Sequence, residues 1–388
     1  MRILYHHRTR GRHVEGVHIR GIVDALRELG HEVTVISFPG ADPEQEPTAA
    51  EGHRRSRLAA LVASLPGVFF ELMELAYNLV TLVRMSVAIR RWRPQAIYER
   101  YSLFLWATVW LARRRGVPVI LEINDSALVE RVRPLWMKGL ARRLEAWCMR
   151  RCTGLVFISS YFLQQAQQRY GAIAPAVISP NAADVRRFDP ARFDAHHLRA
   201  ERGLAGRVVC GHIGAFAHWH GMDQFVAALA SRLDEAPGLT MVLVGDGVTL
   251  PAIRQMVAER GLADRVLLPG RVAHDAIAAW IACMDYAVLP DSNHYGSPMK
   301  LFEFMAMGVG MIAPDYAPIA EVVRDGETGW MFPRGQTDVC VQRVLDLASL
   351  AEERRRVGTA AREYIVHERQ WRNNAEQWLG LLPSGGAH

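Results

Sequence analysis

The chain has 388 residues, too many for one ordinary core, and its 50% hydrophobic and 22% charged residues are typical of a soluble protein with two domains. Its five cysteines include no C-x-x-C pair, which argues against a disulfide framework or a zinc site and favours a reducing, cytoplasmic setting. Residues 1–187 carry 27 Lys and Arg against 16 Asp and Glu, a net charge of +11, and the other residues carry 19 against 24, a net charge of −5. A basic half indicates an anionic partner, but no helix-turn-helix, zinc-finger or RNP-like pattern points to nucleic acid.

The first half of the chain alternates short apolar runs with stretches of helical periodicity. The N-terminus enters a strand directly, so we expect no signal peptide. Strands are predicted at 2–6, 32–38, 96–98, 118–123, 154–159 and 177–179. Helices are predicted at 57–76, 77–92, 103–115 and 134–151. One further helix is predicted to end at about residue 29 and another to end at residue 170. A polar surface loop is predicted at 40–56.

The second half repeats the alternation after a turn-rich linker at 180–190. Strands are predicted at 207–213, 240–244, 266–269, 286–289 and 310–313, and helices at 221–234, 249–260, 274–282, 298–307 and 351–381. Strands separated by helices imply parallel sheets covered on both faces, so the fold class is α/β with two doubly wound, Rossmann-like domains. We place these domains at 1–188 and 189–370 and expect a C-terminal helix at 371–388 to pack back on the first domain. Such domains bind ligands at the carboxyl ends of their strands, so facing ends would make the interdomain cleft the site.

The segment Tyr295–Gly308 points most directly to chemistry. Ser297 suits a helix N-cap and Pro298 suits the first turn, which predicts a short helix whose free N–H groups favour a phosphate. Lys300, one of only two lysines, adds a full positive charge in that turn, and Glu303 offers acceptor oxygens suited to a ribose diol. The alternative is that Lys300 and Glu303 simply pair at i,i+3 on the surface.

This segment resembles the donor-binding stretch of glycosyltransferase family 4, whose members are retaining enzymes of the GT-B fold. Other stretches resemble family turns in the same order along most of the chain. They are Gly11–Gly16, Leu29–Val33, His212–Phe216, Trp219–Asp223, Val244–Gly247, Leu268–Val272 and Asp325–Trp330. The resemblance implies an N-terminal acceptor domain and a C-terminal nucleotide-sugar donor domain facing a cleft.

The resemblance also implies roles for single residues. Catalytic roles fall on Lys300, His220, Asn124 and Asp125. Donor binding falls on Gly11, Gly214, Gly270, Arg271, Val272, Tyr295, Gly296, Ser297, Pro298, Met299 and Glu303. Glu303 matches the second glutamate of the family's E-x7-E pair, which is expected at the nucleotide ribose.

The chain departs from the family pattern at four positions. Tyr295 stands at the first glutamate of the E-x7-E pair, so the usual carboxylate contact to the donor sugar is absent. Ala215 replaces a common arginine, and His220 replaces a common lysine. Asn124 replaces the histidine of a histidine–aspartate pair and cannot act as an acid or a base. We expect Lys300, His220 and the helix N-terminus to supply the missing neutralisation of the diphosphate.

The implied mechanism is retaining transfer without a metal ion, since no D-x-D pair stands in the expected place. The leaving nucleoside diphosphate develops negative charge, and each preorganised donor aimed at that charge is worth roughly 3–4 kcal/mol. We expect a UDP-sugar as co-substrate, with no other cofactor, and a hexose or N-acetylhexosamine as the transferred sugar. The expected acceptor is a saccharide, either lipid-linked or an exopolysaccharide precursor.

Arginines flank an apolar run at 58–89. A basic amphipathic helix can lie on an anionic membrane, which would suit a lipid-linked acceptor at the inner face of the plasma membrane. Charged residues within 67–89 argue against a membrane-spanning segment. We favour instead that the apolar residues Phe69, Phe70, Leu72, Leu75 and Leu79 pack on the sheet of the first domain, and we assign any peripheral membrane contact to the arginines. These are Arg54, Arg55, Arg57, Arg84, Arg90, Arg91 and Arg93.

Two other functions stay open on the sequence. Tyr295, Asn124 and Ala215 would also suit a catalytically silent subunit that binds a nucleotide-sugar. A GT-B sugar-nucleotide epimerase would need acid and base carboxylates, for which the first half offers Glu122, Asp125 and Glu130. Donor binding without turnover would favour the subunit, and sugar isomerisation without an acceptor would favour the epimerase.

Overall fold

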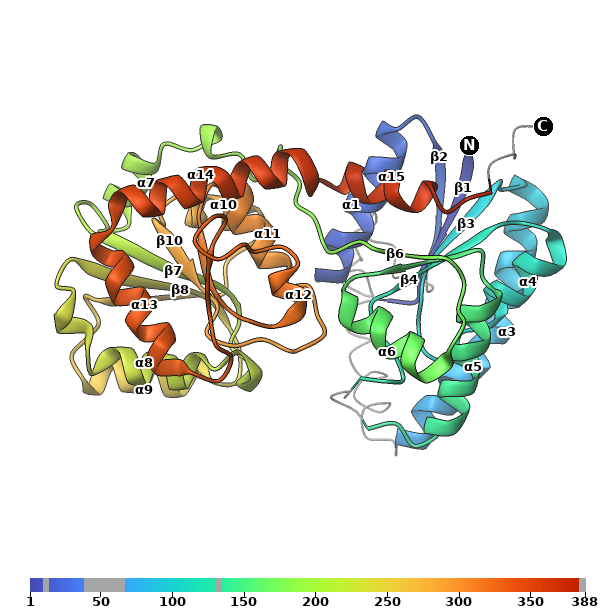
Figure 1. Ribbon diagram of the computed structural model, residues 1–388, viewed down its shortest axis with the longest axis horizontal. Helices are drawn as coiled ribbons and strands as arrows, with labels where there is room; N and C mark the ends of the chain where they lie inside the picture. The colour runs from blue at the N-terminus through green and yellow to red at the C-terminus, as the bar shows by residue number, and fades with distance from the viewer. Residues whose placement is uncertain (10–13, 38–66, 130–133, 384–388) are drawn as a thin grey trace, which may run out of the picture. The chain divides into compact units, whose positions relative to one another are not determined.

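The computed structural model describes residues 1–9, 14–37, 67–129 and 134–383. The chain divides into two compact units (Figure 1). The first is formed by Met1–Pro180 with the C-terminal segment from Trp371, and the second by Asn181–Gln370. The units part before the expected boundary at 188, because Asn181 already bonds within the second unit, where its backbone N–H donates to Ser297 Oγ at 3.1 Å.

The first unit is a six-stranded parallel sheet in the order β2-β1-β3-β4-β5-β6. Its strands are β1 (Arg2–His6), β2 (Glu32–Ile36), β3 (Ala96–Arg100), β4 (Val119–Ile123), β5 (Gly154–Phe157) and β6 (Ala176–Ile178). Its helices are α1 (Val14–Glu28), α3 (Gly67–Trp92), α4 (Ala107–Arg115), α5 (Lys138–Arg151), α6 (Ser160–Tyr170) and α15 (Trp371–Leu379). The prediction of two helices at 57–76 and 77–92 is in part wrong, because residues 67–92 form one unbroken helix. Residues 57–66, the expected loop at 40–56 and Gly11 lie outside the described residues.

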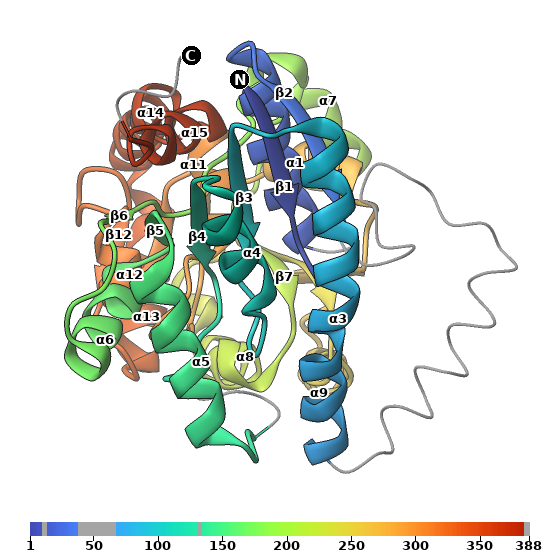
Figure 2. The same ribbon diagram turned by 90° about the vertical axis from the view of Figure 1, so that its right-hand side faces the viewer.

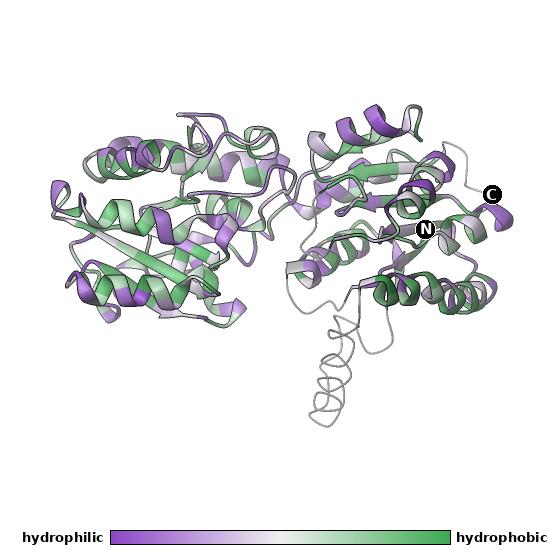
Figure 3. Cartoon of the chain, turned by 90° about the horizontal axis from the view of Figure 1, so that it is seen from below, coloured by the Kyte–Doolittle hydropathy of each residue, from purple (hydrophilic) through white to green (hydrophobic). Residues whose placement is uncertain are grey.

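The second unit is also a six-stranded parallel sheet, in the order β12-β11-β10-β7-β8-β9. Its strands are β7 (Val208–Ala215), β8 (Leu239–Asp246), β9 (Val266–Gly270), β10 (Tyr286–Val288), β11 (Met311–Pro314) and β12 (Trp330–Phe332). Its helices are α7 (Ala195–Glu201), α8 (Met222–Ala230), α9 (Leu250–Glu259), α10 (Ile277–Ile281), α11 (Met299–Ala306), α12 (Ala317–Ala320), α13 (Thr337–Ser349) and α14 (Ala351–Glu368). The α/β class and the alternation are as predicted, whereas β12, α7, α12 and α13 were not predicted. Figure 3 shows hydrophobic colouring along the central strands of both units, as expected for sheets buried on both faces.

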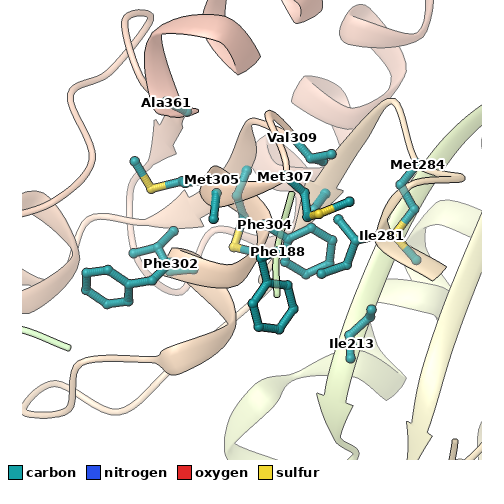
Figure 4. Close-up of a cluster of buried hydrophobic side chains, with 14 of the residues drawn as sticks. Phe188, Ile213, Ile281, Met284, Phe302, Phe304, Met305, Met307, Val309 and Ala361 are labelled. Carbon is teal, nitrogen blue, oxygen red and sulfur yellow. The ribbon is translucent and has the colours of Figure 1, made fainter. Parts of the chain in front are cut away.

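Helix α11 is held by an apolar cluster on one face of the second sheet. Phe302, Phe304 and Met305 of α11 are buried together with Phe188 and with Ile213 of β7 (Figure 4). A well-packed cluster of this kind leaves little freedom for the helix to rotate or slide. The polar residues of α11 are therefore fixed in position relative to the end of β7.

The C-terminal tail, expected as one helix over 351–381, is divided between the units. Helix α14 belongs to the second unit and α15 to the first. In α15, Trp378 is fully buried beside Tyr98, with ring centroids 4.8 Å apart. Trp371 lies over Gly21 of α1, where a Cβ atom would fall 2.5 Å from the indole ring. These two indoles fasten the end of the chain to its first strands and helix.

Helix α3 is attached to the first unit by polar contacts on its inner side. It runs as one continuous helix beside α4 (Figure 2). The buried Glu71 carboxylate accepts the backbone N–H groups of Trp136 and Met137, at 2.6 and 2.7 Å, just before α5 begins. Asn78 donates to the carbonyl of Phe104 at 2.9 Å. A carboxylate at a helix N-terminus satisfies free amides and interacts favourably with the helix dipole.

We predict that Glu71→Ala lowers the free energy of unfolding by about 2 kcal/mol, because two buried amides lose their acceptor. Leu72→Ala changes the neighbouring, exposed side chain and should cost no more than about 0.5 kcal/mol. Urea unfolding of both variants measures the difference. Equal losses in the two variants would show that Glu71 does not hold α5 in place.

Candidate functional site

The strand order of the second sheet reverses at β7: β8 and β9 follow on one side of it, and β10, β11 and β12 follow on the other. Strand β7 pairs with β8 on one side and with β10 on the other, so the chain leaves β9 and returns across the sheet. In doubly wound folds the carboxyl ends of strands at such a switch point are the usual ligand site. Here they carry Gly214 at the end of β7 and the loop that leads from β10 into α11.

Lys300 lies directly against the backbone of Gly214. A Cβ atom at position 214 would fall 2.5 Å from Lys300 Nζ and 2.9 Å from its Cε. Gly214 also has φ +150°, a backbone conformation that other residues rarely adopt. Glycine is therefore required here both for the turn and for the close approach of the ammonium group.

Among the described residues, the ammonium group of Lys300 is buried without a hydrogen-bond partner. Burial lowers the pKa of Lys300 to about 8, although the nearby Glu303 carboxylate acts in the opposite direction. No ion pair within 4.0 Å joins these two described residues, so the expected alternative of a surface pair is wrong for Lys300 and Glu303. A buried cation without a partner is costly, and an anion at this position would offset the cost.

Two histidines stand beside Lys300. His212 Nδ1 bonds to the carbonyl of Val288 at 2.9 Å, and His220 Nδ1 bonds to the carbonyl of Asp291 at 3.3 Å. Because a carbonyl only accepts, each Nδ1 carries the proton and each neutral ring keeps a lone pair on Nε2. Burial and the Lys300 charge lower the pKa of His220 to about 4 and that of His212 well below its ordinary value.

His212 was not predicted as a site residue. It is fully buried and its Nε2 lies 3.6 Å from the position that a Cβ of Gly214 would take. Its spacing was the available signal, since residues two apart on a strand point to the same face of the sheet. Lys300, His220 and His212 thus form a cluster of three basic side chains around Gly214.

Glu303 lies one turn after Lys300 on α11 and is 7% exposed. Burial raises its pKa to about 7, while Arg187 and Lys300 act to lower it. Arg187 is itself bonded to Asp275 at 3.0 Å and to His274. The Glu303 side chain makes no hydrogen bond within the described residues, so its carboxylate oxygens remain available to a ligand hydroxyl.

The start of α11 differs from the prediction. Helix α11 begins at Met299, and Pro298 occupies the N-cap without a side-chain bond, so Ser297 is not the N-cap. Ser297 is used by a residue distant in sequence, because its Oγ and its carbonyl accept the backbone and side-chain N–H groups of Asn181 at 3.1 and 2.6 Å. The first amides of α11 are therefore not capped by a side chain and can bind an anion.

The loop before α11 is shaped by Asn293. Its Oδ1 accepts the backbone N–H groups of Tyr295 and Gly296, at 3.3 and 2.5 Å. A Cβ at Gly296 would fall 2.7 Å from that oxygen, so glycine is required for this turn. The Tyr295 ring packs on His294, with centroids 5.3 Å apart.

The loop after β8 packs against the loop after β7, backbone on backbone. A Cβ at Gly245 would fall 1.8 Å from the carbonyl oxygen of Gly214, and one at Gly247 would fall 2.6 Å from that of Phe216. At the next strand end, Gly270 closes β9 with φ +80°. Arg271 is exposed and Val272 is half-buried against the apolar cluster.

The remaining predicted residues lie in the first unit, directly after β4. Asn124 has a buried Nδ2 without a partner, and Asp125 accepts the Ser126 N–H at 2.9 Å. The neighbouring Glu122 bonds to His18 and, at 3.2 Å, to Arg100. Burial alone would raise the pKa of Glu122, but His18 and Arg100 outweigh it and the pKa falls to about 2. Glu122 is therefore a permanently charged member of a structural ion-pair cluster and a poor acid or base.

Within the described parts of the chain, no group of three His, Cys, Asp or Glu side chains is placed to hold a metal ion. What the second unit offers instead is a cluster for an anion. Among the described residues it combines a buried, unpaired ammonium group, two imidazoles, uncapped helix amides and the turn at Gly214. A carboxylate stands one helical turn away. This arrangement is suited to a phosphate group attached to a hydroxyl-bearing sugar.

Comparison with known proteins identifies the family. Residues 16–187 match the model described as Glycosyltransferase Family 4, and residues 207–349 match the model described as Glycosyl transferases group 1. The chain belongs to glycosyltransferase family 4.

The glycosyltransferase is similar along most of its length to characterised enzymes. It is 28% identical to the 2-deoxystreptamine glucosyltransferase of Streptomyces kanamyceticus, over 89% of this chain and 92% of that protein. It is 27% identical to the 2-deoxystreptamine N-acetyl-D-glucosaminyltransferase of Streptomyces fradiae, over 87% of this chain and 82% of that protein. The crystal structure of Anabaena Alr3699/HepE in complex with UDP has the same fold, with a TM-score of 0.70, 16% identity, and coverage of 98% of this chain and 99% of that one. The GT-B fold expected from the resemblance is confirmed.

We predict that Lys300→Met raises the melting temperature of the ligand-free glycosyltransferase by a few degrees, because it removes a buried, unpaired charge. The pKa of Lys300 is lowered by folding, so protonation destabilises the folded state. The difference between variant and wild type should be complete below pH about 8 and shrink as the pH rises toward the ordinary lysine value of 10.5. The control is Lys138→Met. Lys138 is the only other lysine and is exposed, so this variant should leave the melting temperature unchanged. A lower melting temperature for Lys300→Met would contradict an unpaired ammonium.

We further predict that Gly214→Ala weakens the binding of UDP and of inorganic pyrophosphate by at least about tenfold, because the new methyl group displaces the Lys300 ammonium. Gly206→Ala is the matched control, since Gly206 has φ +70° but nothing within 4 Å of its Cβ position. The control should lose some stability and keep its affinity. Isothermal titration calorimetry measures both, and equal affinities in the two variants would contradict the position of Lys300.

Proposed function

We propose that this glycosyltransferase binds the diphosphate of a UDP-sugar at the cluster around Gly214 and transfers a hexose or N-acetylhexosamine to a saccharide acceptor. The transfer proceeds with retention and without a metal ion. The first unit binds the acceptor and the second binds the donor. The two characterised relatives support this choice of sugars, because their names specify glucose and N-acetyl-D-glucosamine.

The observation that carries the donor site is the unpaired, buried ammonium of Lys300. In the free protein this charge is desolvated and has no hydrogen-bond partner in the described part of the chain, which supports a protein arranged in advance for an anion. When the bond to the sugar breaks, negative charge develops on the diphosphate and the fixed ammonium stabilises it without reorganisation. The uncapped amides at Met299 and Lys300 act on the same charge.

The two histidines make donor binding at this site depend on pH. In the free protein both rings are neutral, so each Nε2 is an acceptor and cannot donate to a phosphate. A bound diphosphate favours the charged form of a nearby imidazole and raises its pKa. We therefore propose that donor binding takes up a proton on His220, the half-buried ring of the pair, while His212 holds the backbone around Lys300.

The acceptor side rests on fewer contacts. The Asn124 amide, with an Nδ2 that bonds nothing in the described part of the chain, can donate to a sugar hydroxyl but cannot carry a proton in the reaction. Asp125 keeps one oxygen bonded to the Ser126 N–H. We propose an acceptor that is lipid-linked or an exopolysaccharide precursor. The five cysteines are free and buried, which supports a cytoplasmic location at the inner face of the plasma membrane.

The proposed function predicts a selective stabilisation by UDP and UDP-sugars in a thermal-shift panel of nucleoside diphosphates and their sugars. A true donor at about 100 times its dissociation constant should add roughly 2.7 kcal/mol of stability. With a matching donor, the protein should also hydrolyse it slowly and transfer the sugar to a saccharide acceptor. Lys300→Met and Glu303→Gln should each lower kcat/KM by about 100-fold or more, as expected for lost transition-state donors.

The same panel separates this function from its competitors. Full activity in both variants would defeat the assignment of the site. Donor binding without turnover would indicate a silent binding subunit, and isomerised UDP-sugar without an acceptor would indicate an epimerase. Calorimetry in two buffers of different ionisation enthalpy reports the proton uptake, and no uptake on UDP binding would exclude the role given to His220.

A further inference from the structure

Helix α3 presents a row of apolar residues on its outside, in addition to the apolar residues Tyr77, Met85 and Ile89 that it buries. From position 69 to position 87, every exposed residue of the helix is apolar, and these residues recur at helical spacing along one side. We call this side the outer face of α3. It consists of Phe69, Leu72, Met73, Ala76, Leu79, Val80, Val83 and Val87. Leu79 and Val83, one turn apart at its centre, are 68% and 65% exposed. The prediction that Phe69, Leu72 and Leu79 pack on the sheet is therefore wrong.

The polar residues of α3 point the other way and are used by the protein. Glu71 and Asn78 make the inner contacts described above, and Glu74 pairs with Arg8 at 2.6 Å. Arg84 donates to the carbonyl of Ser37. The helix is long and apolar enough, by length and composition, to cross a membrane. Its inner side is nevertheless bonded to the rest of the unit, so the helix can only lie flat against an apolar phase.

Basic and aromatic residues stand at the ends of the outer face. Arg90 and Arg91, both exposed, lie on the same side of the helix one turn after Val87. At the other end Trp136 is 70% exposed, and its indole lies 2.5 Å from the position that a Cβ of Gly67 would take. Lys138 follows Trp136 and is also exposed. No acidic side chain of α3 is exposed, and Glu32, which accepts from Trp92 at 3.2 Å, is an acidic neighbour at the Arg90 and Arg91 end, so the exposed charge that α3 itself contributes is positive.

We propose that the outer face of α3 docks on an anionic bilayer, with the helix lying in the plane of the interface. Apolar residues would enter the boundary between headgroups and acyl chains, and Arg90, Arg91 and Lys138 would meet lipid phosphates. Tryptophan at the edge of such a face is typical of the interfacial region. Charge favours a bilayer over a protein partner here, because the exposed charged residues of α3 itself are all basic, and an apolar strip beside basic residues complements an anionic surface. The proposal concerns a surface of the first unit and does not depend on the transferase reaction.

The test is flotation of the purified full-length chain with lipid vesicles. Wild-type protein should float with phosphatidylcholine vesicles that contain about a third phosphatidylglycerol, and should float less with phosphatidylcholine alone. The double variant Leu79→Gln/Val83→Gln adds no charge and should lower the bound fraction by about tenfold. The double variant Arg90→Gln/Arg91→Gln should instead abolish most of the preference for anionic vesicles, by about tenfold or more.

The matched control is Val339→Gln/Leu350→Gln, which makes equivalent changes at exposed apolar positions of the second unit and should float as wild type does. Melting temperatures of all variants should agree within about two degrees, because the changed side chains are exposed. Wild-type protein that fails to float with either vesicle overturns the proposal, as does normal flotation of Leu79→Gln/Val83→Gln. A dimer of the wild type that this variant dissolves, without vesicle binding, would assign the face to a second copy of the chain. UDP binding measured on the same samples distinguishes these outcomes from a failure of the donor site.

Discussion

One positive charge, buried without a hydrogen-bond partner among the described residues, sets the requirements of the second unit. The Lys300 ammonium can occupy its place only because position 214 has no side chain, and position 214 can take its backbone angle only because it is glycine. Gly245 at the end of β8 and Gly247 just after it let this segment pack directly against the turn at Gly214. The apolar side chains of α11 then fix the lysine against it. A site that holds a charge in this way lowers the stability of the ligand-free protein but is preorganised for its ligand.

Most of the fold could be predicted from the sequence because parallel strands buried on both faces are continuous apolar runs. Strands such as 2–6 and 118–123 carry that signal fully. The short elements do not, since β12 has three residues and α12 has four, too few for a periodic pattern. The hydrophobic pattern also misled at α3. The apolar residues of α3 lie on both sides of the helix, and its polar residues lie on the side that faces the core, so the pattern alone did not show which side is exposed.

The candidate site was predictable in part for reasons that differ by residue. Lys300 and Glu303 were found because a lysine is rare in this chain and because the turn-and-helix pattern has a physical use for it. Ser297 has the right residue type for an N-cap, but Asn181, more than a hundred positions earlier, takes its hydroxyl. The two-residue spacing of His212 and Gly214 on β7 was visible in the sequence, but His212 was missed because its bond to Val288 is made on the adjacent strand. Long-range pairings of this kind leave no trace in a local sequence window.

The return of α15 to the first unit has a consequence for biosynthesis. The segment that buries Trp371 and Trp378 beside α1 and β3 is translated after the whole second unit, Asn181–Gln370. Ribosomes add roughly 5–20 residues per second, so the nascent first unit waits on the order of 10–40 seconds for its last helix. During that interval Gly21 and Tyr98 lack their covering indoles. Completion of the first unit is thereby coupled to completion of the chain, and a prematurely terminated product carries an open apolar surface for chaperones and proteases to recognise.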